Sequence, residues 1–184
     1  ARRVREAGVF SLLVSPTISV SELRAMKPKA IILSGGPSSV YDAGAPTCDP
    51  AIFEMGVPVL GICYGMQLAA KLLGAHVAKA DHREFGRAAL SVENHAELFK
   101  ATPDKMTVWM SHGDQVSDPS GIFEVLGATA TCPLAAVRRV AKGQTFFGVQ
   151  FHPEVTHTPH GSDLLRNFLY EVCKCDGSWR MADY

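Results

Sequence analysis

The stretch Val57-Pro-Val-Leu-Gly-Ile-Cys-Tyr-Gly65 carries the clearest structural signal in this chain of 184 residues. Residues 57–60 form an apolar run, which is typical of a strand buried on both faces of a sheet. Residues 64–73 follow with helical spacing of their apolar side chains, and Gly74 suits the end of that helix. The stretch therefore predicts a buried strand that turns directly into a helix, with Cys63 at the turn.

The segments on either side of this turn predict an α/β fold. Upstream we expect strands at residues 9–14 and 30–33, a helix at 19–26 and a helical turn at 51–55. This alternation is typical of a parallel sheet covered by helices. Downstream we expect a final amphipathic helix at 161–173 and, before it, strands at residues 76–80, 88–92, 106–110, 123–128, 135–140 and 146–151. The pattern predicts a mostly parallel central sheet flanked by helices, with an antiparallel extension.

The composition disfavours several classes of protein. Lys and Arg together number 18, as do Asp and Glu, so no net charge favours binding to nucleic acid or to an anionic membrane. No apolar run approaches the roughly 20 residues that span a bilayer. Five irregularly spaced cysteines argue against a disulfide framework and favour a reducing, cytoplasmic setting. The histidines form no metal-like pattern with cysteines or carboxylates, so no metal site is expected.

Cys63 stands in the pattern G-x-Nuc-x-G, formed by Gly61-Ile-Cys63-Tyr-Gly65. A nucleophile on a sharp strand-to-helix turn has a strained backbone, and flanking glycines allow chain and substrate to approach closely. The N-terminus of the following helix favours a thiolate and offers the Tyr64 N–H to an oxyanion. The alternative is that Cys63 is a small buried hydrophobic residue, as free cysteines often are.

His152 and Glu154, in Gln150-Phe-His152-Pro-Glu154, are the candidates for the base that a cysteine nucleophile needs and for the group that orients this base. In an extended segment, side chains two residues apart lie on the same side, and Pro153 stiffens the stretch between them. Spacing alone does not bring His152 to Cys63, which lies 89 residues earlier (152 − 63). The alternative is a surface histidine beside a solvated carboxylate.

Ser34-Gly-Gly-Pro37 follows the expected strand at residues 30–33. The carboxyl ends of parallel strands meet at one edge of a sheet, where open α/β sheets bind ligands. This loop is therefore expected beside Cys63, with the Gly36 N–H as a candidate second oxyanion donor. A plain turn without that role is the alternative.

Trp109-Met-Ser-His-Gly-Asp114 ends another expected strand with polar residues and a glycine. Such a loop is a candidate for holding the ammonium and carboxylate groups of an amino acid. Gln67 lies one helical turn after Cys63 and faces the same side. Glu84 is either a further pocket residue or a salt-bridge partner, and the sequence does not separate the two.

Three motifs, LSGGP, GICYGMQ and QFHPE, together resemble those of class I glutamine amidotransferases of the triad type, and the match covers nearly the whole chain. The resemblance implies a flavodoxin-like fold and hydrolysis of L-glutamine through a cysteinyl thioester, without a cofactor or metal in this domain. It implies these roles: nucleophile Cys63, base His152, orienting residue Glu154, oxyanion donors Gly36 and Tyr64, and glutamine-binding residues Gln67, Ser111, His112, Gly113 and Asp114.

Further segments resemble one branch of that family, the glutaminase domains of GMP synthetases. They are REFG at residues 83–86, WMSHGD at 109–114, HPEVTHT at 152–158 and the C-terminal C-x-C…W-x-M run. The resemblance implies a partner, an ATP-pyrophosphatase synthetase domain on the same longer chain or a separate subunit. That partner would use ATP and magnesium to aminate XMP to GMP with the ammonia. We therefore expect a glutaminase domain at residues 1–175 and the start of a linker at 176–184.

Both ends of the chain read as cut, because it starts without Met in a helix-like segment and ends without a closing element. The GMP synthetase branch begins with one more strand before the ARRVREAG-like helix. We expect the lack of that strand here to leave a neighbouring strand of the sheet unpaired.

Three alternative functions are open at this stage. A γ-glutamyl cysteine hydrolase would share the nucleophile and base but accept larger substrates, so free glutamine and a γ-glutamyl peptide would distinguish it. A glutaminase could also serve a different synthetase. A non-catalytic binding domain on the same fold is disfavoured, because such a domain need not keep Cys63, His152 and Glu154 together.

Overall fold

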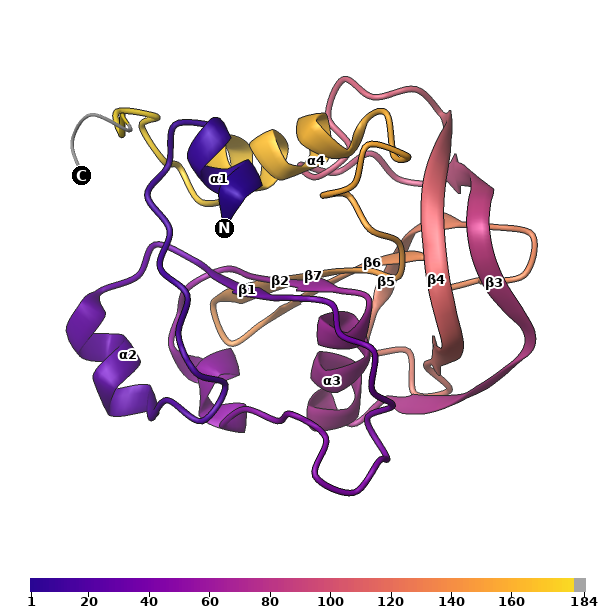
Figure 1. Cartoon of the computed structure of the whole chain (residues 1–184), viewed down its shortest axis with the longest axis horizontal. Coiled ribbons are helices and arrows are strands. Elements are labelled where there is room, and N and C mark those ends of the chain that lie inside the picture. The colour runs from indigo at the N-terminus through magenta and orange to yellow at the C-terminus, as the bar shows by residue number, and fades with distance from the viewer. Residues whose placement is uncertain (181–184) are drawn as a thin grey trace.

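The computed structural model describes residues 1–180, which form one seven-stranded sheet with helices on both of its faces (Figure 1). The strands are β1 (Ile31–Leu33), β2 (Val59–Ile62), β3 (His76–Val92), β4 (Lys105–Ser117), β5 (Glu124–Ala128), β6 (Ala136–Ala141) and β7 (Gln144–Val149). The helices are α1 (Arg2–Glu6), α2 (Val20–Met26), the 3₁₀ helix η1 (Pro50–Glu54), α3 (Tyr64–Leu73), and α4 (Gly161–Asn167), which continues as the π-helical turn η2 (Phe168–Val172).

The strand order is β1-β2-β7-β6-β5-β3-β4. The pairs β1–β2 and β2–β7 are parallel, whereas the four remaining neighbouring pairs are antiparallel. The predicted α/β fold with a parallel centre and an antiparallel extension is therefore confirmed. The parallel part is confined to three strands, and the antiparallel part curls away from it to the side of β3 and β4 (Figure 1).

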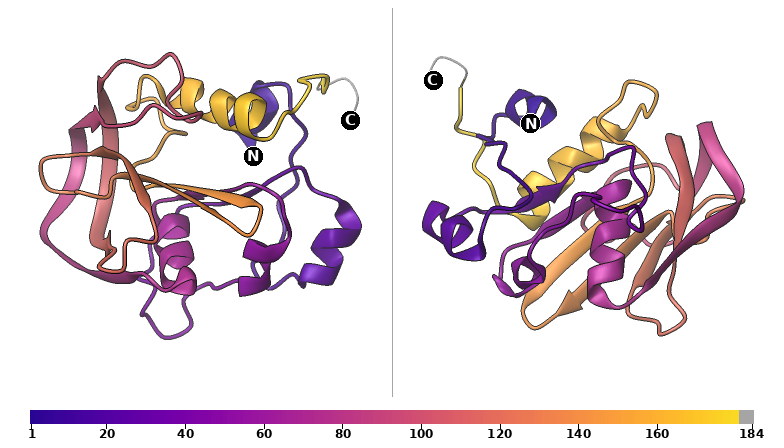
Figure 2. Two further views of the ribbon diagram at one scale, coloured as in Figure 1. Left: turned by 180° about the vertical axis from the view of Figure 1, so that it is seen from behind. Right: turned by 60° about the horizontal axis from the view of Figure 1, so that its bottom comes forward.

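Side chains that alternate along β2 and β7 divide the core into two clusters. Leu60 and Phe147 belong to the cluster that includes residues of α1 and α4. Val59 and Phe146 belong to the other cluster, with residues of α2 and α3. Figures 1 and 2 show α1 and α4 on one face of the sheet and α2 and α3 on the other. Both faces of the parallel strands are thus covered, as their continuous apolar sequences predict.

Several helices and strands match the sequence closely. Helix α3 has the predicted bounds and ends at Gly74 in the left-handed conformation. Helix α2 has the predicted capping box, in which Ser19 and Glu22 satisfy each other's backbone N–H groups. Residues 76–80 and 88–92, predicted as two strands, belong instead to the single long strand β3, which passes through a register shift between Lys79 and Glu84.

The predicted strand at residues 9–14 is wrong. This segment has no regular secondary structure and pairs with no strand in the part of the chain that the structure describes. It leaves large apolar side chains exposed: Phe10, Leu12, Leu13 and Val14. A segment rich in strand-forming residues becomes a strand only when it pairs with a sheet edge, and this segment does not pair with the open edge of β1. Strand β1 lies at the edge of the sheet, and among the described strands it pairs with β2 alone. This agrees with the expectation that one strand of the sheet is left without a partner on one side.

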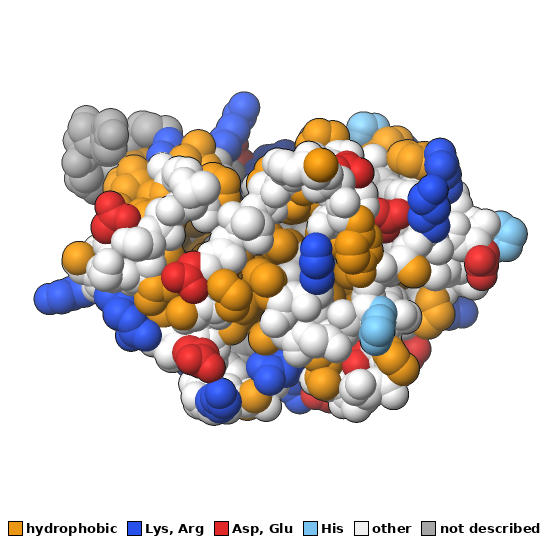
Figure 3. All heavy atoms as spheres, turned by 90° about the horizontal axis from the view of Figure 1, so that it is seen from below, with side chains coloured by type: hydrophobic (Ala, Val, Ile, Leu, Met, Phe, Trp, Pro, Cys, Tyr) orange, Lys and Arg blue, Asp and Glu red, His pale blue; other side chains and the backbone are white. Residues whose placement is uncertain are grey.

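Charged side chains of both signs are interspersed with apolar ones on the face that carries α2 and α3, and neither sign dominates there (Figure 3). No helix formed by residues 1–180 has the length and apolar character needed to cross a bilayer. The predicted linker at residues 176–184 lies partly outside the described residues, and residues 176–180 within it form neither helix nor strand.

Candidate active site

Cys63 lies at the junction of β2 and α3, as predicted, and its backbone is strained. Its φ and ψ are 50° and −108°, outside the regions that residues with a side chain normally adopt. Such strain persists only where surrounding contacts enforce it, and it is common at functional sites. Strand β2 and helix α3 therefore fix the direction of the Cys63 side chain.

The glycines on either side of Cys63 are required by close packing. A Cβ atom on Gly65 would lie 2.1 Å from the carbonyl oxygen of Leu33 in β1. A Cβ atom on Gly61 would lie 2.8 Å from the backbone of Met66. No side chain fits at either position without moving backbone. We call residues 61–65 the elbow, and its shape rests on contacts that only glycine permits.

His152 follows β7 and is hydrogen bonded to the side chains of both Cys63 and Glu154. Its Nδ1–H donates to Glu154 Oε1 over 2.7 Å. The backbone on either side of it is also fixed, because the His152 N–H donates to the Trp109 carbonyl and the Thr158 hydroxyl donates to the His152 carbonyl. The structure thus brings together the three residues that the sequence placed in a triad, across a separation that spacing alone only allowed.

The three side chains are coupled electrostatically. The hydrogen bond to Cys63, and then that to Glu154, raises the pKa of His152 to about 10, although burial opposes this. Burial raises the pKa of Glu154, but the hydrogen bond from His152, a backbone hydrogen bond and nearby positive charges together leave that pKa below its ordinary value. His152 therefore carries a proton at neutral pH and faces a sulfur atom on one side and a carboxylate on the other. The arrangement provides a nucleophile, a proton donor and an orienting anion.

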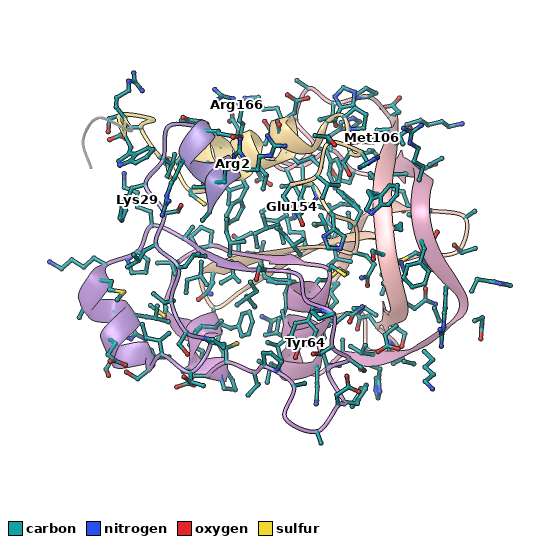
Figure 4. The ribbon with its side chains drawn as sticks, viewed as in Figure 1. Arg2, Lys29, Tyr64, Met106, Glu154 and Arg166 are labelled. Carbon is teal, nitrogen blue, oxygen red and sulfur yellow. The ribbon has the colours of Figure 1, made fainter. Side chains whose placement is uncertain are left out.

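Figure 4 shows Glu154 between α4 and the central strands, and Tyr64 at the start of α3 on the other face. Tyr64 occupies the first position of α3, where a backbone N–H has no partner within the helix. Gly36 lies beside it, since a Cβ on Gly36 would be 3.8 Å from the Tyr64 ring. The two predicted oxyanion donors are thus neighbours, and their role stays a prediction.

The sulfur of Cys63 is almost enclosed, and the residue is 3% exposed. Its Sγ lies 3.7 Å from the Ser111 carbonyl oxygen and 3.6 Å from Nε2 of Gln150. Gly35 closes another side, because a Cβ there would lie 3.0 Å from Cε1 of His152 and 3.7 Å from Cβ of Cys63. Cavities of about 410 and 270 Å³ lie along β3 and residues 156–159, and Cys63 lines neither of them.

Residues 34–49, which we call the strap, include Gly35. Hydrogen bonds tie the strap to the rest of the site at several points. The Ser39 hydroxyl donates to Oδ2 of Asp114 over 2.6 Å. The ammonium group of Lys71 donates to the Val40 carbonyl. The hydroxyl of Tyr64 donates to the Pro46 carbonyl. The strap is therefore a wall of the site that side-chain hydrogen bonds hold in place.

Residues 111–114 were predicted as a loop after a strand, and this prediction is wrong. Strand β4 runs through them to Ser117, and His112 and Asp114 pair with Glu84 and Lys79 of β3. Pairing with β3 outweighs the weak strand propensity of Ser, Gly and Asp. The segment still lies at the nucleophile, through the Ser111 carbonyl.

Three of the predicted substrate-binding residues are hydrogen bonded to other protein groups. Gln67 is buried, and its Nε2 donates to the Asp114 carbonyl over 2.9 Å and to Oε1 of Gln150 over 3.2 Å. The Asp114 carboxylate faces the strap through Ser39. The His112 ring is buried between the Asp114 carbonyl and the Glu84 carboxylate, so it contacts protein groups on both sides.

Sequence reasoning did not single out Gln150, Gly35 or Ser39, although Gln150 and Gly35 stand inside motifs that it quoted. It also left the role of Glu84 undecided, and in the structure a Glu84 carboxylate oxygen lies 3.1 Å from Nε2 of His112. Glu84, His112 and Cys132 have ligand-type atoms within 4.8 Å of one another. These three residues are far apart in the sequence, so no spacing pattern announces the cluster.

A family model described as "Glutamine amidotransferase class-I" matches residues 1–172. Curated proteins named GMP synthase [glutamine-hydrolyzing] from Geobacillus kaustophilus and Macrococcus caseolyticus are 53% and 51% identical to this chain over 183 residues. These matches cover 100% of this chain but 36% and 35% of the relatives. The chain thus spans about a third of the length of these relatives.

Solved structures agree with the sequence relatives. A protein from Thermoplasma acidophilum, described as one subunit of a GMP synthase, superposes with a TM-score of 0.83 and 33% identity over 94% of this chain and 85% of its own. A glutamine amidotransferase from Thermotoga maritima has a TM-score of 0.68 at 21% identity, over 82% of this chain and 80% of its own, which supports the fold alone. Because the family model and the relatives match the chain almost from end to end, the protein belongs to the class I glutamine amidotransferase family.

Proposed function

We propose that this chain hydrolyses L-glutamine to glutamate and ammonia through a glutamyl thioester on Cys63. The observation that carries the proposal is the strained elbow that holds Cys63 beside the His152 ring, which Glu154 orients through a hydrogen bond. A cysteine, a histidine and a carboxylate in this order of contact are the parts of a nucleophilic triad. Family membership supports the same chemistry.

In the first half-reaction, the sulfur of Cys63 attacks the side-chain amide carbon of glutamine, and the carbonyl oxygen becomes an oxyanion. The N–H groups of Tyr64 and Gly36 are the proposed donors to that oxyanion, and losing one such donor typically slows a reaction by about 100- to 1,000-fold. His152 gives its proton to the departing nitrogen, which leaves as ammonia, and a thioester remains.

In the second half-reaction, His152 acts as a base and removes a proton from water. The resulting hydroxide attacks the thioester carbon, and the C–S bond breaks to release glutamate and restore Cys63. Gln67 and the backbone of residues 111–114 are the proposed contacts for the amino acid part of glutamine, supported by their positions around the sulfur. Since Cys63 is nearly enclosed, part of its surroundings has to move before glutamine can enter.

We further propose that the ammonia serves a synthetase partner that aminates XMP to GMP. The support is the likeness to GMP synthases, which are about three times as long as this chain. ATP and magnesium would act in that synthetase domain, on the same longer chain or on a separate subunit. Residues 1–175 would be the glutaminase domain, and residues 176–184 would begin the connection. The five free cysteines agree with a cytoplasmic location.

The test measures glutamate released from glutamine by the chain and by a Cys63→Ala variant. We expect release by the natural chain and none by the variant. A glutamine-like electrophile should also label Cys63 stoichiometrically, and free glutamine should block the labelling. The labelling measurement is needed because such domains are often weakly active without their synthetase partner. Slow turnover alone therefore does not distinguish a catalytic from a non-catalytic domain.

Substrate choice separates this proposal from a γ-glutamyl cysteine hydrolase. Free glutamine should be the better substrate, and a γ-glutamyl peptide that reacts faster would contradict the proposal. An absence of both turnover and glutamine-protected labelling would contradict catalysis altogether.

A further inference from the structure

A continuous chain of hydrogen bonds links Thr129, directly after β5, and Glu84 of β3 to the surroundings of the Cys63 sulfur. It starts at the Thr129 hydroxyl, which donates to Oε1 of Glu84 over 3.1 Å. The other carboxylate oxygen of Glu84 lies 3.1 Å from Nε2 of His112, and Nδ1 of His112 lies 2.9 Å from the Asp114 carbonyl oxygen. That carbonyl also accepts from Gln67, which donates onward to Gln150, and Nε2 of Gln150 lies 3.6 Å from the sulfur of Cys63.

Proton counting constrains the middle of this chain. A carbonyl oxygen only accepts hydrogen bonds, so Nδ1 of His112 must carry a proton to bind Asp114. Nε2 faces the Glu84 carboxylate, so protein groups engage both ring nitrogens of His112. The His112 side chain is 1% exposed and that of Glu84 is 14% exposed, so water does not replace either partner.

Two amide side chains lie further along the same chain of hydrogen bonds. The Asp114 carbonyl accepts from His112 and from Gln67, which uses both of its lone pairs. Gln67 then has both N–H groups engaged, one to Asp114 and one to Gln150. Gln150 in turn accepts through its oxygen and can direct its N–H groups at the sulfur. A 180° flip of either amide group would place two donors or two acceptors against each other.

We infer that His112 is a positioning residue for glutamine hydrolysis, which helps to hold the Asp114 carbonyl, and through it Gln67 and Gln150, in place beside Cys63, while Glu84 stabilises the buried His112 ring. Neither side chain contacts the sulfur, and both act through the Asp114 carbonyl. This inference rests on the proposed function. It gives the Glu84 side chain, through its contact with His112, an indirect role at Cys63, although Glu84 itself does not contact the sulfur.

Two substitutions of His112 separate positioning from a merely structural role. In His112→Asn the side-chain amide nitrogen takes the place of Nδ1 and keeps the bond to Asp114. In His112→Gln the amide nitrogen takes the place of Nε2 and keeps the contact with Glu84. Both variants lose one buried hydrogen bond, so a structural role predicts similar kinetics for the two.

We expect His112→Asn to keep the KM for glutamine within about threefold and His112→Gln to raise it by about tenfold or more, the range of one lost buried hydrogen bond. Unfolding free energy should fall in both, and more in His112→Asn, which leaves the Glu84 carboxylate without its partner. The double change His112→Asn with Glu84→Gln should recover stability while leaving that KM unchanged.

Equal KM values for the two His112 variants, or a KM that follows stability through the series, would overturn the inference. If the natural chain neither hydrolyses glutamine nor shows glutamine-protected labelling of Cys63, the proposed function fails instead, so the two failures are distinguishable.

The Cys132 side chain supplies the matched control, because it belongs to the same cluster but is not a member of the chain of hydrogen bonds described above. A divalent ion held by Glu84, His112 and Cys132 would replace the contact between Glu84 and His112. We expect no stoichiometric metal in the purified protein by elemental analysis, and unchanged glutamine kinetics in Cys132→Ser. One zinc ion per chain that this variant loses would show a metal site in place of that contact and overturn the inference.

Discussion

Cys63 and the groups that face it are held in two different ways. The elbow at residues 61–65 is fixed by backbone packing, in which Gly65 touches β1 and Gly61 touches the start of α3. Residues 111–114 and 150–154, which we call the polar wall, have backbone partners as well, but side-chain hydrogen bonds from β3, α3 and the strap hold them in addition. The sulfur thus projects from a rigid turn toward partners held by a network.

This difference teaches which changes should affect folding and which should affect chemistry. Where backbone atoms leave no room for a methyl group, adding one forces the backbone to move, and the fold loses stability. A hydrogen-bond network loses one bond at a time, so its failures are graded and appear first in rates and affinities. The predictions below test that division, in order of decreasing expected effect.

The largest effect should come from the polar wall, at Glu154. The change Glu154→Gln keeps the size of the side chain but removes the charge that orients His152 and favours its protonated form. We expect kcat for glutamine hydrolysis to fall by about 100-fold or more, the usual contribution of a positioned acid or base. The free energy of unfolding should change by only about 1 kcal/mol. A stability loss that accounts for the lost activity would show that the two regions are not distinct.

The elbow should respond in the opposite manner. In Gly65→Ala the new methyl group would lie 2.1 Å from the Leu33 carbonyl oxygen, so backbone has to move. We expect a loss of about 3 kcal/mol in the free energy of unfolding by urea, together with lost activity. Gly44→Ala is the control, because its φ is +76° but a Cβ there meets nothing within 4 Å. It should lose about 1 kcal/mol. Equal losses at both positions would refute packing as the reason for Gly65.

The triad also predicts how stability depends on pH. The pKa of His152 is raised from 6.5 to about 10 in the folded protein. The stabilisation from its protonated form is therefore complete below about pH 6.5 and is lost as the pH rises through about 10. We expect the stability advantage of the natural chain over His152→Asn to shrink across this interval, as measured by urea unfolding at several pH values. Cysteines, tyrosines and lysines titrate in both proteins, so only the difference is informative. An advantage that grows with pH would contradict a proton shared with Cys63 and Glu154.

The smallest effect should follow the removal of one tie on the strap. Ser39→Ala deletes the hydrogen bond to the Asp114 carboxylate. We expect iodoacetamide to alkylate Cys63 a few times faster, since a single hydrogen bond to a charged group stabilises the closed strap by about 1 kcal/mol or slightly more. Ser38→Ala, one residue earlier, should leave the alkylation rate unchanged. If the two variants react alike, the strap does not control access to the sulfur.

The same division explains what the sequence revealed. The elbow and α3 could be predicted because glycine, cysteine and helix-forming residues announce them locally, and α3 has the expected bounds. His152 and Glu154 could be named, but only the fold brings them to Cys63. In the polar wall the roles of Glu84 and Gln150 depend on partners far along the chain, and no local pattern encodes such pairs.

Two mistaken predictions have a common physical cause. Residues 111–114 have weak strand propensity yet lie inside β4, because β3 pairs with them. Residues 9–14 have strong strand propensity yet form no strand, because they pair with no described strand. In both cases the neighbouring edge decided the outcome and the propensity of the segment did not.

The near-complete enclosure of Cys63 has a consequence for its chemical durability. Oxidation of a cysteine to sulfenic and sulfinic acids requires that peroxide reach the sulfur. With 3% of the residue exposed, the resting protein shields the atom on which the proposed activity depends. If the proposed hydrolysis requires the surroundings of Cys63 to open, damage by oxidants should accumulate during turnover, and the protein without substrate should survive peroxide longer than the protein that is turning over.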